Sequence, residues 1–185
     1  MNYIGLKQGT VRVIKYNSKW KSIFDKEKKL LLKSFPKNII DVSHGGSTAI
    51  PGLFAKPIID MFATIHFLSD VEKLKLDLGK MGYEYKGEQG VPGRILYVKG
   101  STECRTHHLQ FVLPTSDQWK NHILLKKYYI RHPKIAEEYS KLKIYLAKKF
   151  PKDRKSYTNS KDSFIKSIID KAKKEMSKGI FDIEI

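Results

Sequence analysis

Residues 44–60 read HGGSTAIPGLFAKPIID, and this stretch predicts a strand, a turn of small residues and then a second strand. Gly45 and Gly46 allow positive φ angles and let the backbone approach a ligand closely. Ser47 and Thr48 add hydroxyl groups beside the backbone N–H groups that such a turn exposes. The pattern therefore predicts a turn of the kind that holds phosphate groups.

A single acid, Asp60, lies in the second of these strands, which we predict over residues 58–65. Pro57 is compatible with the start of a strand, so the apolar run follows it directly. An ionised carboxylate in such a run is costly unless it is paired, hydrogen-bonded or bound to a metal. Asp60 is thus a candidate for metal binding and catalysis. A tight turn with a structural aspartate fits the same spacing.

Strand alternation places further polar groups on the face that carries Asp60. In the strand predicted over residues 106–113, His108 and Gln110 share one face, and His107 lies on the other with the apolar residues. His108 and Gln110 are therefore the better candidates for a polar cleft. We expect His107 to point toward the core.

The order of the expected elements indicates an α/β core followed by helices. Alternating apolar residues predict strands, and apolar residues at helical spacing predict helices. The expected strands cover residues 10–14, 39–43, 58–65, 83–86, 94–99 and 106–113, and the expected helices cover 18–34, 69–82, 117–131, 133–149 and 157–178. Ser69 is the expected N-cap of the second helix, and Gly82 is expected to end it. We predict a core over residues 1–115 and a C-terminal helical region over residues 116–185, packed together as one structural unit.

The composition fits a globular protein. The chain has 185 residues, of which 41% are hydrophobic. No apolar run approaches the ~18 residues that a membrane span needs. Cys104 is the only cysteine, so no intrachain disulfide can form, and a reducing compartment is expected. These features predict a cytoplasmic protein without a membrane partner.

The chain carries a formal net charge of +17, from 36 basic and 19 acidic residues. Such a charge attracts nucleotides and nucleic acids at long range. Only five of the basic residues are arginine, which is the residue that best makes bidentate contacts with phosphates and bases. The sequence also contains no RNA- or DNA-binding motif. Nucleic-acid binding is therefore an alternative that the sequence does not favour.

A resemblance to a known family extends over nearly the whole chain. Residues 44–53 and 55–60 are similar to the signature of the GrpB family of predicted nucleotidyltransferases. The likeness continues at Tyr16, Asn17, Trp20, Phe24, Gly82, Tyr83, Gly93, Arg94, residues 105–109, residues 131–139, Phe150, Pro151, Tyr157 and Lys161. The resemblance implies a small mixed β-sheet of the polymerase-β nucleotidyltransferase type, with flanking helices and a C-terminal helical region.

The same resemblance implies a metal-dependent nucleotidyltransferase, which would transfer a nucleotidyl group from a nucleoside triphosphate to an acceptor of unknown identity. On this hypothesis Asp60 and His108 bind Mg²⁺ or Mn²⁺ and are the catalytic residues. The phosphates would be held by Gly46, Ser47, Thr48, Lys56, Arg94 and Arg105.

The candidate metal ligands depart from the pattern of polymerase-β-type enzymes. Those enzymes pair two acids at positions i and i+2 of a strand, but the i+2 position here is Phe62. A later strand supplies His108 and Gln110 where a third acid is expected, and GrpB-like sequences often carry a second histidine in place of Gln110. Glu88 and Glu103 lie in predicted turns and are candidates for the missing carboxylate. The alternative hypothesis is a catalytically degenerate module that binds a nucleotide or a phosphorylated metabolite.

The expected helices offer further candidates for a wall of the cleft. These candidates are Arg131, Tyr139, Lys143 and Tyr157, which fit equally well as ordinary packing and surface residues. We expect the side chains of Ser47, Asp60 and His108 to meet in one cleft, with Arg94 or Arg105 at its rim.

Overall fold

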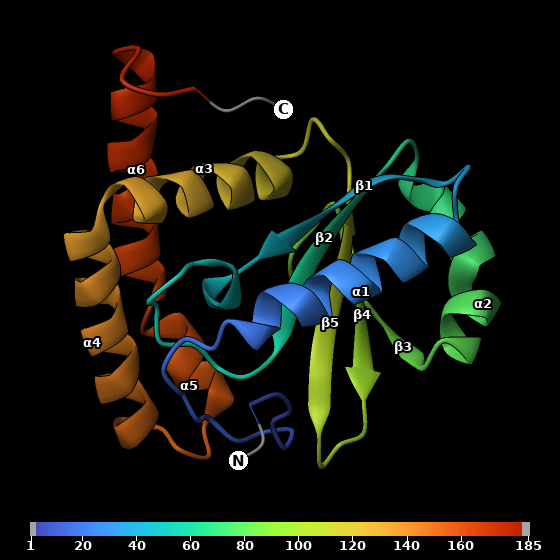
Figure 1. Ribbon diagram of the computed structural model, residues 1–185, viewed down its shortest axis with the longest axis horizontal. Coiled ribbons are helices and arrows are strands. Elements are labelled where there is room, and N and C mark those ends of the chain that lie inside the picture. Colours follow the sequence, from blue (N-terminus) through green and yellow to red (C-terminus); the bar gives the residue numbers. More distant parts are fainter. Residues whose placement is uncertain (1–2, 183–185) are drawn as a thin grey trace.

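The computed structural model describes residues 3–182, which form a five-stranded mixed sheet with helices packed around it (Figure 1). The strands are β1 (Ile39–Gly45), β2 (Ile59–Ile65), β3 (Tyr83–Gly87), β4 (Arg94–Gly100) and β5 (Arg105–Val112). They lie in the order β1-β2-β5-β4-β3. The β2–β5 pair is parallel, and the other three pairs are antiparallel. The α/β class and the small mixed sheet predicted from the sequence are confirmed.

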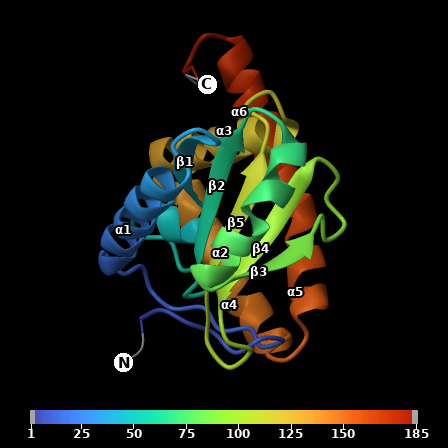
Figure 2. The same cartoon turned by 90° about the vertical axis from the view of Figure 1, so that its right-hand side faces the viewer.

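The helices fall into two groups around this sheet. They are α1 (Lys19–Ser34), α2 (Lys75–Lys80), α3 (Asp117–Arg131), α4 (Pro133–Lys149), α5 (Arg154–Asn159) and α6 (Asp162–Ser177), with short 3₁₀ helices η1 (Ser47–Ala49) and η2 (Leu68–Leu74). In Figure 1, α1 crosses in front of the strands, and α3 to α6 gather at the left. In Figure 2 the same four helices lie behind the strands. No helix in residues 3–182 has the length and apolar character needed to cross a membrane.

One face of the sheet is apolar and fully packed. Ile59, Met61 and Ala63 of β2 alternate onto this face, and each is completely buried. Trp20 and Leu31 of α1 belong to the same core cluster and are also completely buried. Residues of η2 and α2 complete the cluster. This face therefore supplies the main hydrophobic core of the sheet.

The opposite face of the same strands carries polar side chains. Asp60 of β2 lies opposite His108 of β5, and Phe62 lies opposite Gln110, because the two strands pair in parallel register. His107 falls on the core side, where it is buried. The face assignment predicted from strand alternation is confirmed.

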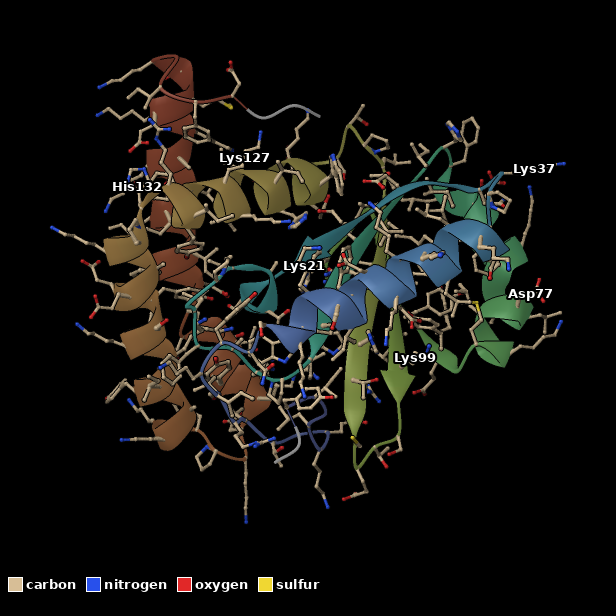
Figure 3. All side chains as sticks on the ribbon, viewed as in Figure 1. Lys21, Lys37, Asp77, Lys99, Lys127 and His132 are labelled. Atoms are coloured by element: carbon tan, nitrogen blue, oxygen red, sulfur yellow. The ribbon has the colours of Figure 1, made fainter. Side chains whose placement is uncertain are left out.

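Helices α3, α4 and α6 are tied to one another by aromatic and polar contacts. The rings of Tyr129 on α3 and Phe164 on α6 both stack on the ring of Tyr139 on α4, with 5.3 Å between the ring centroids in each pair. His132, labelled in Figure 3 at the corner between α3 and α4, lies 2.9 Å from a carboxylate oxygen of Glu175 on α6. These contacts hold the helices as one wall beside the sheet. The predicted boundary at residue 115 falls between β5 and α3 and stays a prediction.

The strand predicted over residues 10–14 does not form, so this prediction is wrong. Ile14 makes only an isolated bridge to the loop before β2. Val11 and Val13 pack instead in a small cluster with Leu146 of α4. Their alternating pattern therefore reflects burial against a helix, because apolar periodicity reports burial and does not report ladder hydrogen bonds.

Two helix predictions also need correction. Ser69 does not cap a helix, because the helical turn η2 begins one residue earlier and makes no side-chain cap hydrogen bond. Gly82 does follow the end of α2, with a φ of +85°. The single helix predicted over residues 157–178 is two helices, α5 and α6. Asp153 caps α5 by accepting a hydrogen bond from the backbone N–H of Ser156, so this helix begins earlier than expected.

Candidate functional site

The turn after β1 is pressed against the single acid of β2. Gly46 begins the turn with a φ of +60°, in the left-handed region that favours glycine. A Cβ atom at this position would clash with Oδ2 of Asp60, so only glycine lets the turn approach that carboxylate. Ser47–Ala49 then form the short helix η1. The predicted turn is therefore present, and it contacts Asp60 directly.

Asp60 is held in place by His108. Nδ1 of His108 lies 2.9 Å from Oδ1 of Asp60 and donates to it when the carboxylate is ionised. Burial alone would raise the pKa of Asp60, but the hydrogen bond from His108 and the charges of Lys56 and Arg154 lower it below its ordinary value. The Asp60 side chain is 32% exposed, whereas His108 is buried. Asp60 is thus an ionised carboxylate with one accessible side.

A cavity of about 400 Å³ opens on this accessible side, between the polar face of the sheet and helices α3, α4 and α6. Its apolar wall consists of Ile50, Phe62, Leu125, Tyr129 and Ile165. Phe62 lies flat against the ring of His122, with 4.2 Å between the ring centroids. Burial lowers the pKa of His122 to about 3, so this ring is neutral. The wall is suited to a flat, apolar ligand group.

Arg94 and Gln110 supply polar groups to the same large cavity. Nη1 of Arg94 donates to Oε1 of Gln110 at 2.7 Å, and Nε donates to the backbone carbonyl of Glu88 at 3.2 Å. Two hydrogen bonds therefore hold the guanidinium in place. Arg94 lies where the sequence predicts it, beside the cleft of Asp60.

A smaller cavity of about 170 Å³ adjoins the large one. The two cavities share Gly46, Ser47, Asp60, Tyr139 and Lys161. The remaining walls of the small cavity are formed by Thr48, Ala55, Lys56, Lys143 and Tyr157. Asp60 therefore lies at the boundary between two spaces of different chemistry.

The small cavity is lined by three lysines from separate parts of the chain. Lys56 comes from the loop before β2, Lys143 from α4 and Lys161 from the start of α6. Nζ of Lys56 lies 5.7 Å from the ring centroid of Tyr157, and Nζ of Lys161 lies 4.4 Å from it. None of the three lysines forms an ion pair with another residue in 3–182.

Burial makes these lysines unusually weak bases. The pKa of Lys56 is lowered to about 7 by burial, with the charges of Lys161 and Arg154 adding to the effect. Burial lowers the pKa of Lys161 to about 8, although the charge of Asp60 opposes this change. The pKa of Lys143 is also well below its ordinary value because of burial. The small cavity is therefore deficient in negative charge, which an anionic ligand would supply.

Hydroxyl groups of the turn are engaged in separate hydrogen bonds. Oγ of Ser47 accepts a hydrogen bond from Nζ of Lys143 at 2.8 Å, and the same ammonium donates to the backbone carbonyl of Phe54. Oγ1 of Thr48 lies 3.0 Å from Nε2 of His44, whose ring is buried on the core side. Thr48 thus anchors the turn to the core, and Ser47 connects it to α4.

Arg105 lies apart from the two cavities. Its Nη2 donates to Oε1 of Gln8 at 3.2 Å and lies 3.8 Å from Oε2 of Glu84. Arg105 lines a separate small hollow together with Lys56 and Arg154. The structure therefore brings Arg94, and not Arg105, to the rim of the Asp60 cleft.

Nearby carboxylates do not complete a pair of magnesium sites. Residues 3–182 contain no group of three or more His, Cys, Asp or Glu side chains that could hold a metal ion. Glu88 accepts a hydrogen bond from a backbone N–H in its own turn, and Glu103 forms an exposed ion pair, so neither lines the two cavities beside Asp60. Asp60 also gives one carboxylate oxygen to His108. These residues do not fit the two-metal arrangement of polymerase-β-type enzymes.

The helices contribute more of the site than the sequence indicates. Of the four helix residues considered for a wall of the cleft, Tyr139, Lys143 and Tyr157 line the small cavity, and the exposed Arg131 does not. His122 lines the large cavity, although its sequence context suggests no role. Its stacking on a sheet residue is a tertiary contact that no local sequence pattern reports.

Comparisons with known proteins identify the family. The family model described as GrpB protein matches residues 10–171, and this chain belongs to that family. It is 36% identical over 170 residues to the glutamate-rich protein GrpB of Alkalihalophilus pseudofirmus, which covers 90% of this chain and 98% of that protein. It is 38% identical over 164 residues to the UPF0157 protein YqkA of Bacillus subtilis. That match covers 89% of this chain but only 48% of YqkA, so the chain spans about half of that relative.

Two solved structures share the fold. The crystal structure of conserved protein GrpB from Enterococcus faecalis superposes with a TM-score of 0.83 at 35% identity, covering 89% of this chain and 99% of that one. The structure of a cytoplasmic RNA terminal U-transferase superposes with a TM-score of 0.50 at 16% identity, covering 73% of this chain and 43% of that one. The second likeness is one of fold alone. The family resemblance and the nucleotidyltransferase-like fold expected from the sequence are confirmed.

Proposed function

We propose that this protein binds a nucleotide, or a phosphorylated metabolite of similar shape, in the two joined cavities beside Asp60. The observation that carries the proposal is the difference in chemistry between the cavities. The large one has an apolar wall, with Arg94 and Lys126 among its remaining residues, whereas the small one is lined by three lysines and has no comparable apolar wall. A nucleotide has the same division between a flat base and a charged phosphate chain.

The large cavity supports this proposal through its shape and lining. Its volume of about 400 Å³ lies within the range of about 300–1,000 Å³ that is typical of small-molecule sites. Its apolar wall, which includes Phe62 and Tyr129, would contact the base. Arg94 and Gln110 would orient the base through its polar edge.

Asp60 has a role in this proposal that requires no metal. Its carboxylate lies between the two cavities, where a ribose or similar group of the ligand would stand. A carboxylate that is already ionised and fixed by His108 accepts hydrogen bonds from ligand hydroxyl groups at little cost in reorganisation. Asp60 would therefore set the position of the ligand between its two ends.

Titration calorimetry with the four common nucleoside triphosphates and with ADP tests the proposal. We expect at least one of them to bind with a dissociation constant of about 1 mM or lower. Ile165→Trp should fill part of the large cavity and abolish this binding. Leu76→Trp is the matched control, because Leu76 is 79% exposed on α2 and lines neither cavity. Absence of binding by every probe to the wild-type protein would contradict the proposal.

A second candidate function is nucleotidyl transfer to an acceptor, which the fold shared with the RNA terminal U-transferase favours. The sequence predicts Asp60 and His108 as its catalytic and metal-binding residues, with Mg²⁺ or Mn²⁺ as the metal. Among these two, only Asp60 lines the cavities, because His108 is buried behind it with Nδ1 directed at the carboxylate. Asp60 is therefore the residue on which a test of catalysis should depend.

Incubation with labelled nucleoside triphosphates, Mg²⁺ or Mn²⁺ and cell extract tests this second candidate. Transfer of label by the wild-type protein and by Asp170→Asn, but not by Asp60→Asn, would support catalysis. Asp170 is an exposed acid of α6, so Asp170→Asn is a control that removes the same negative charge as Asp60→Asn. If no nucleotide gives transfer that depends on Asp60, the catalytic candidate is wrong, and the binding proposal is still judged by titration.

A further inference from the structure

We infer that the small cavity binds a phosphoryl group of the ligand through Lys56 and Lys161, and that these ammonium groups replace divalent metal ions as its counter-charge. The inference rests on the proposed function, because it assigns the phosphorylated end of the ligand to one of the two cavities. Binding of the phosphoryl group in the small cavity therefore does not require magnesium.

The geometry places two ammonium groups at one aromatic ring. Nζ of Lys56 and Nζ of Lys161 lie 5.7 Å and 4.4 Å from the ring centroid of Tyr157, and all three residues line the small cavity. Tyr157 is almost completely buried, at 1% exposure, so it is a fixed support. Cation–π attraction holds each ammonium at the cavity wall without using all of its N–H donors.

The charges in the small cavity do not balance. Its lining includes three lysines and one carboxylate, that of Asp60, which leaves an excess of two positive charges when all are ionised. A phosphoryl monoester carries a charge of about −1.5 to −2 at neutral pH. The excess positive charge therefore matches the charge of one phosphoryl group. No carboxylate in residues 3–182 forms an ion pair with these lysines.

Burial of unpaired ammonium groups is costly, and the cost falls when an anion enters. Lys143 is the exception among the three lysines, because its ammonium already donates to Oγ of Ser47 and to the carbonyl of Phe54. Lys143 therefore shapes the cavity and adds charge, whereas Lys56 and Lys161 keep donors for a ligand. The lowered pKa values of these two lysines reflect burial without a carboxylate partner in an ion pair.

The size of the small cavity agrees with this ligand group. Its volume is about 170 Å³, and a water molecule in the liquid occupies about 30 Å³. The space therefore admits a phosphoryl group. We assign the base to the large cavity because the apolar wall lies there, with Asp60 between the two ends.

A divalent metal ion would be poorly placed at this end of the site. It would add positive charge beside three ammonium groups, with Asp60 as the one acidic ligand that lines the cavity. Mg²⁺ is usually held by one or two carboxylates together with substrate phosphates, and it binds weakly where its neighbours repel it. The lysines and a metal ion are therefore alternatives as counter-charges for the same phosphate.

Calorimetric titration of the full chain with ATP, inorganic pyrophosphate and adenosine tests the inference, in the presence of either EDTA or Mg²⁺. We expect ATP and pyrophosphate to bind equally well with EDTA. Lys161→Gln and Lys56→Gln should each weaken both ligands by about tenfold, because each removes a charged hydrogen-bond donor. Adenosine binding should be unchanged in Lys56→Gln, because Lys56 does not line the large cavity. Lys166→Gln, which removes an exposed charge from α6, should bind all three probes as the wild-type protein does.

The outcomes separate this inference from the proposed function. If ATP binds only with Mg²⁺, or if both lysine variants bind ATP as tightly as the wild-type protein, the inference is overturned and nucleotide binding stands. If neither ATP nor pyrophosphate binds under any condition, the inference fails, and the other nucleotides decide the proposed function. Thermal unfolding of each variant identifies any loss of binding that arises from loss of the fold.

Discussion

The two faces of the sheet are built from alternate residues of the same strands, yet they serve different purposes. On one face Ile59, Met61 and Ala63 are completely buried under α1 and α2. On the other face Asp60 and Phe62 line a cavity under the C-terminal helices. Because successive side chains of a strand point in opposite directions, one short segment both holds the core and presents the site. Stability and ligand binding can therefore be changed separately at neighbouring positions.

The clearest test of this difference compares Met61→Ala with Phe62→Ala. We expect Met61→Ala to lower the free energy of unfolding by about 2–5 kcal/mol, because it removes a completely buried side chain and leaves a void. Phe62→Ala should cost less stability and should weaken nucleotide binding. Urea denaturation and calorimetric titration measure the two effects. Equal losses of stability in both variants would contradict the assignment of separate purposes to the two faces.

A second test concerns the contact between the turn and the acid. Gly46→Ala should abolish nucleotide binding and lower the free energy of unfolding by about 1–3 kcal/mol, because the added Cβ meets the carboxylate of Asp60 at a positive φ. Gly52→Ala is the control, since Gly52 has a φ of +81° and no atom within 4 Å of an added Cβ. It should show a cost of about 1–2 kcal/mol from backbone strain, with binding retained. Loss of binding in both variants would mean that the turn acts through its backbone alone.

A smaller effect is expected from the residue that holds Asp60. His108→Ala removes the hydrogen bond to the carboxylate and should lower the free energy of unfolding by about 1–2 kcal/mol at neutral pH. The pKa of Asp60 is lowered in the folded state, so its stabilising contribution is present above the unfolded pKa and is lost as the pH falls through the folded value. The pKa of Asp60, followed by NMR, should rise in His108→Ala. His108→Asn keeps a hydrogen-bond donor and should therefore restore most of the lost stability and most of the lowering of the Asp60 pKa. An unchanged Asp60 pKa in His108→Ala would contradict this role of His108.

A further test concerns the dependence of stability on pH. Lys56 and Lys161 have pKa values of about 7 and 8 in the folded state, against an ordinary value of 10.5. Between pH 7 and 10.5 the unfolded chain therefore binds more protons, and the free energy of unfolding should rise with pH in this window. Burial is the main cause of both low pKa values. The facing charges are those of Asp60 and Arg154 for both lysines, of Asp162 for Lys161, and of Lys161 for Lys56.

Phosphate binding should show the opposite trend with pH. The affinity for pyrophosphate should fall as the pH is raised from about 7 to about 9, because Lys56 loses its proton first and Lys161 loses its proton next. Titration at several pH values measures this trend. Lys161→Gln should flatten it, and a wild-type affinity that does not change over this range would contradict a role for the two ammonium groups.

Much of the site could be predicted from local patterns. Alternation along two strands placed Asp60, His108 and Gln110 on one face, because the two-residue period of a strand does not depend on the rest of the fold. Residues 44–60 indicated the turn that contacts Asp60, since glycine tolerates the positive φ that such a turn uses and hydroxyl residues favour turns. The assignments of Mg²⁺ or Mn²⁺, of nucleic acid as a less favoured partner and of a cytoplasmic location stay predictions.

Other parts of the site had no comparable signal. Lys143 and Lys161 are two among many lysines of the chain, and their burial beside the turn arises only when α4 and α6 pack against it. Ile165 belongs to an apolar stripe of α6 that also fits ordinary core packing. An apolar pattern shows that a side chain is covered, but it does not show whether protein or ligand covers it.

The sequence by itself indicated the family, through motifs spread over nearly the whole chain, and the resemblance implied the mixed sheet. Strand alternation, which is a local pattern, placed the face on which Asp60 lies. Only the tertiary structure decided which charges surround Asp60. It turned Arg105 away, left Glu88 and Glu103 at the surface, and brought lysines from the helices to the turn. The physical reason is the separation along the sequence of the groups that interact. Backbone preferences and strand alternation are local, whereas burial and electrostatic interaction depend on groups that are distant in sequence and meet only in the folded chain.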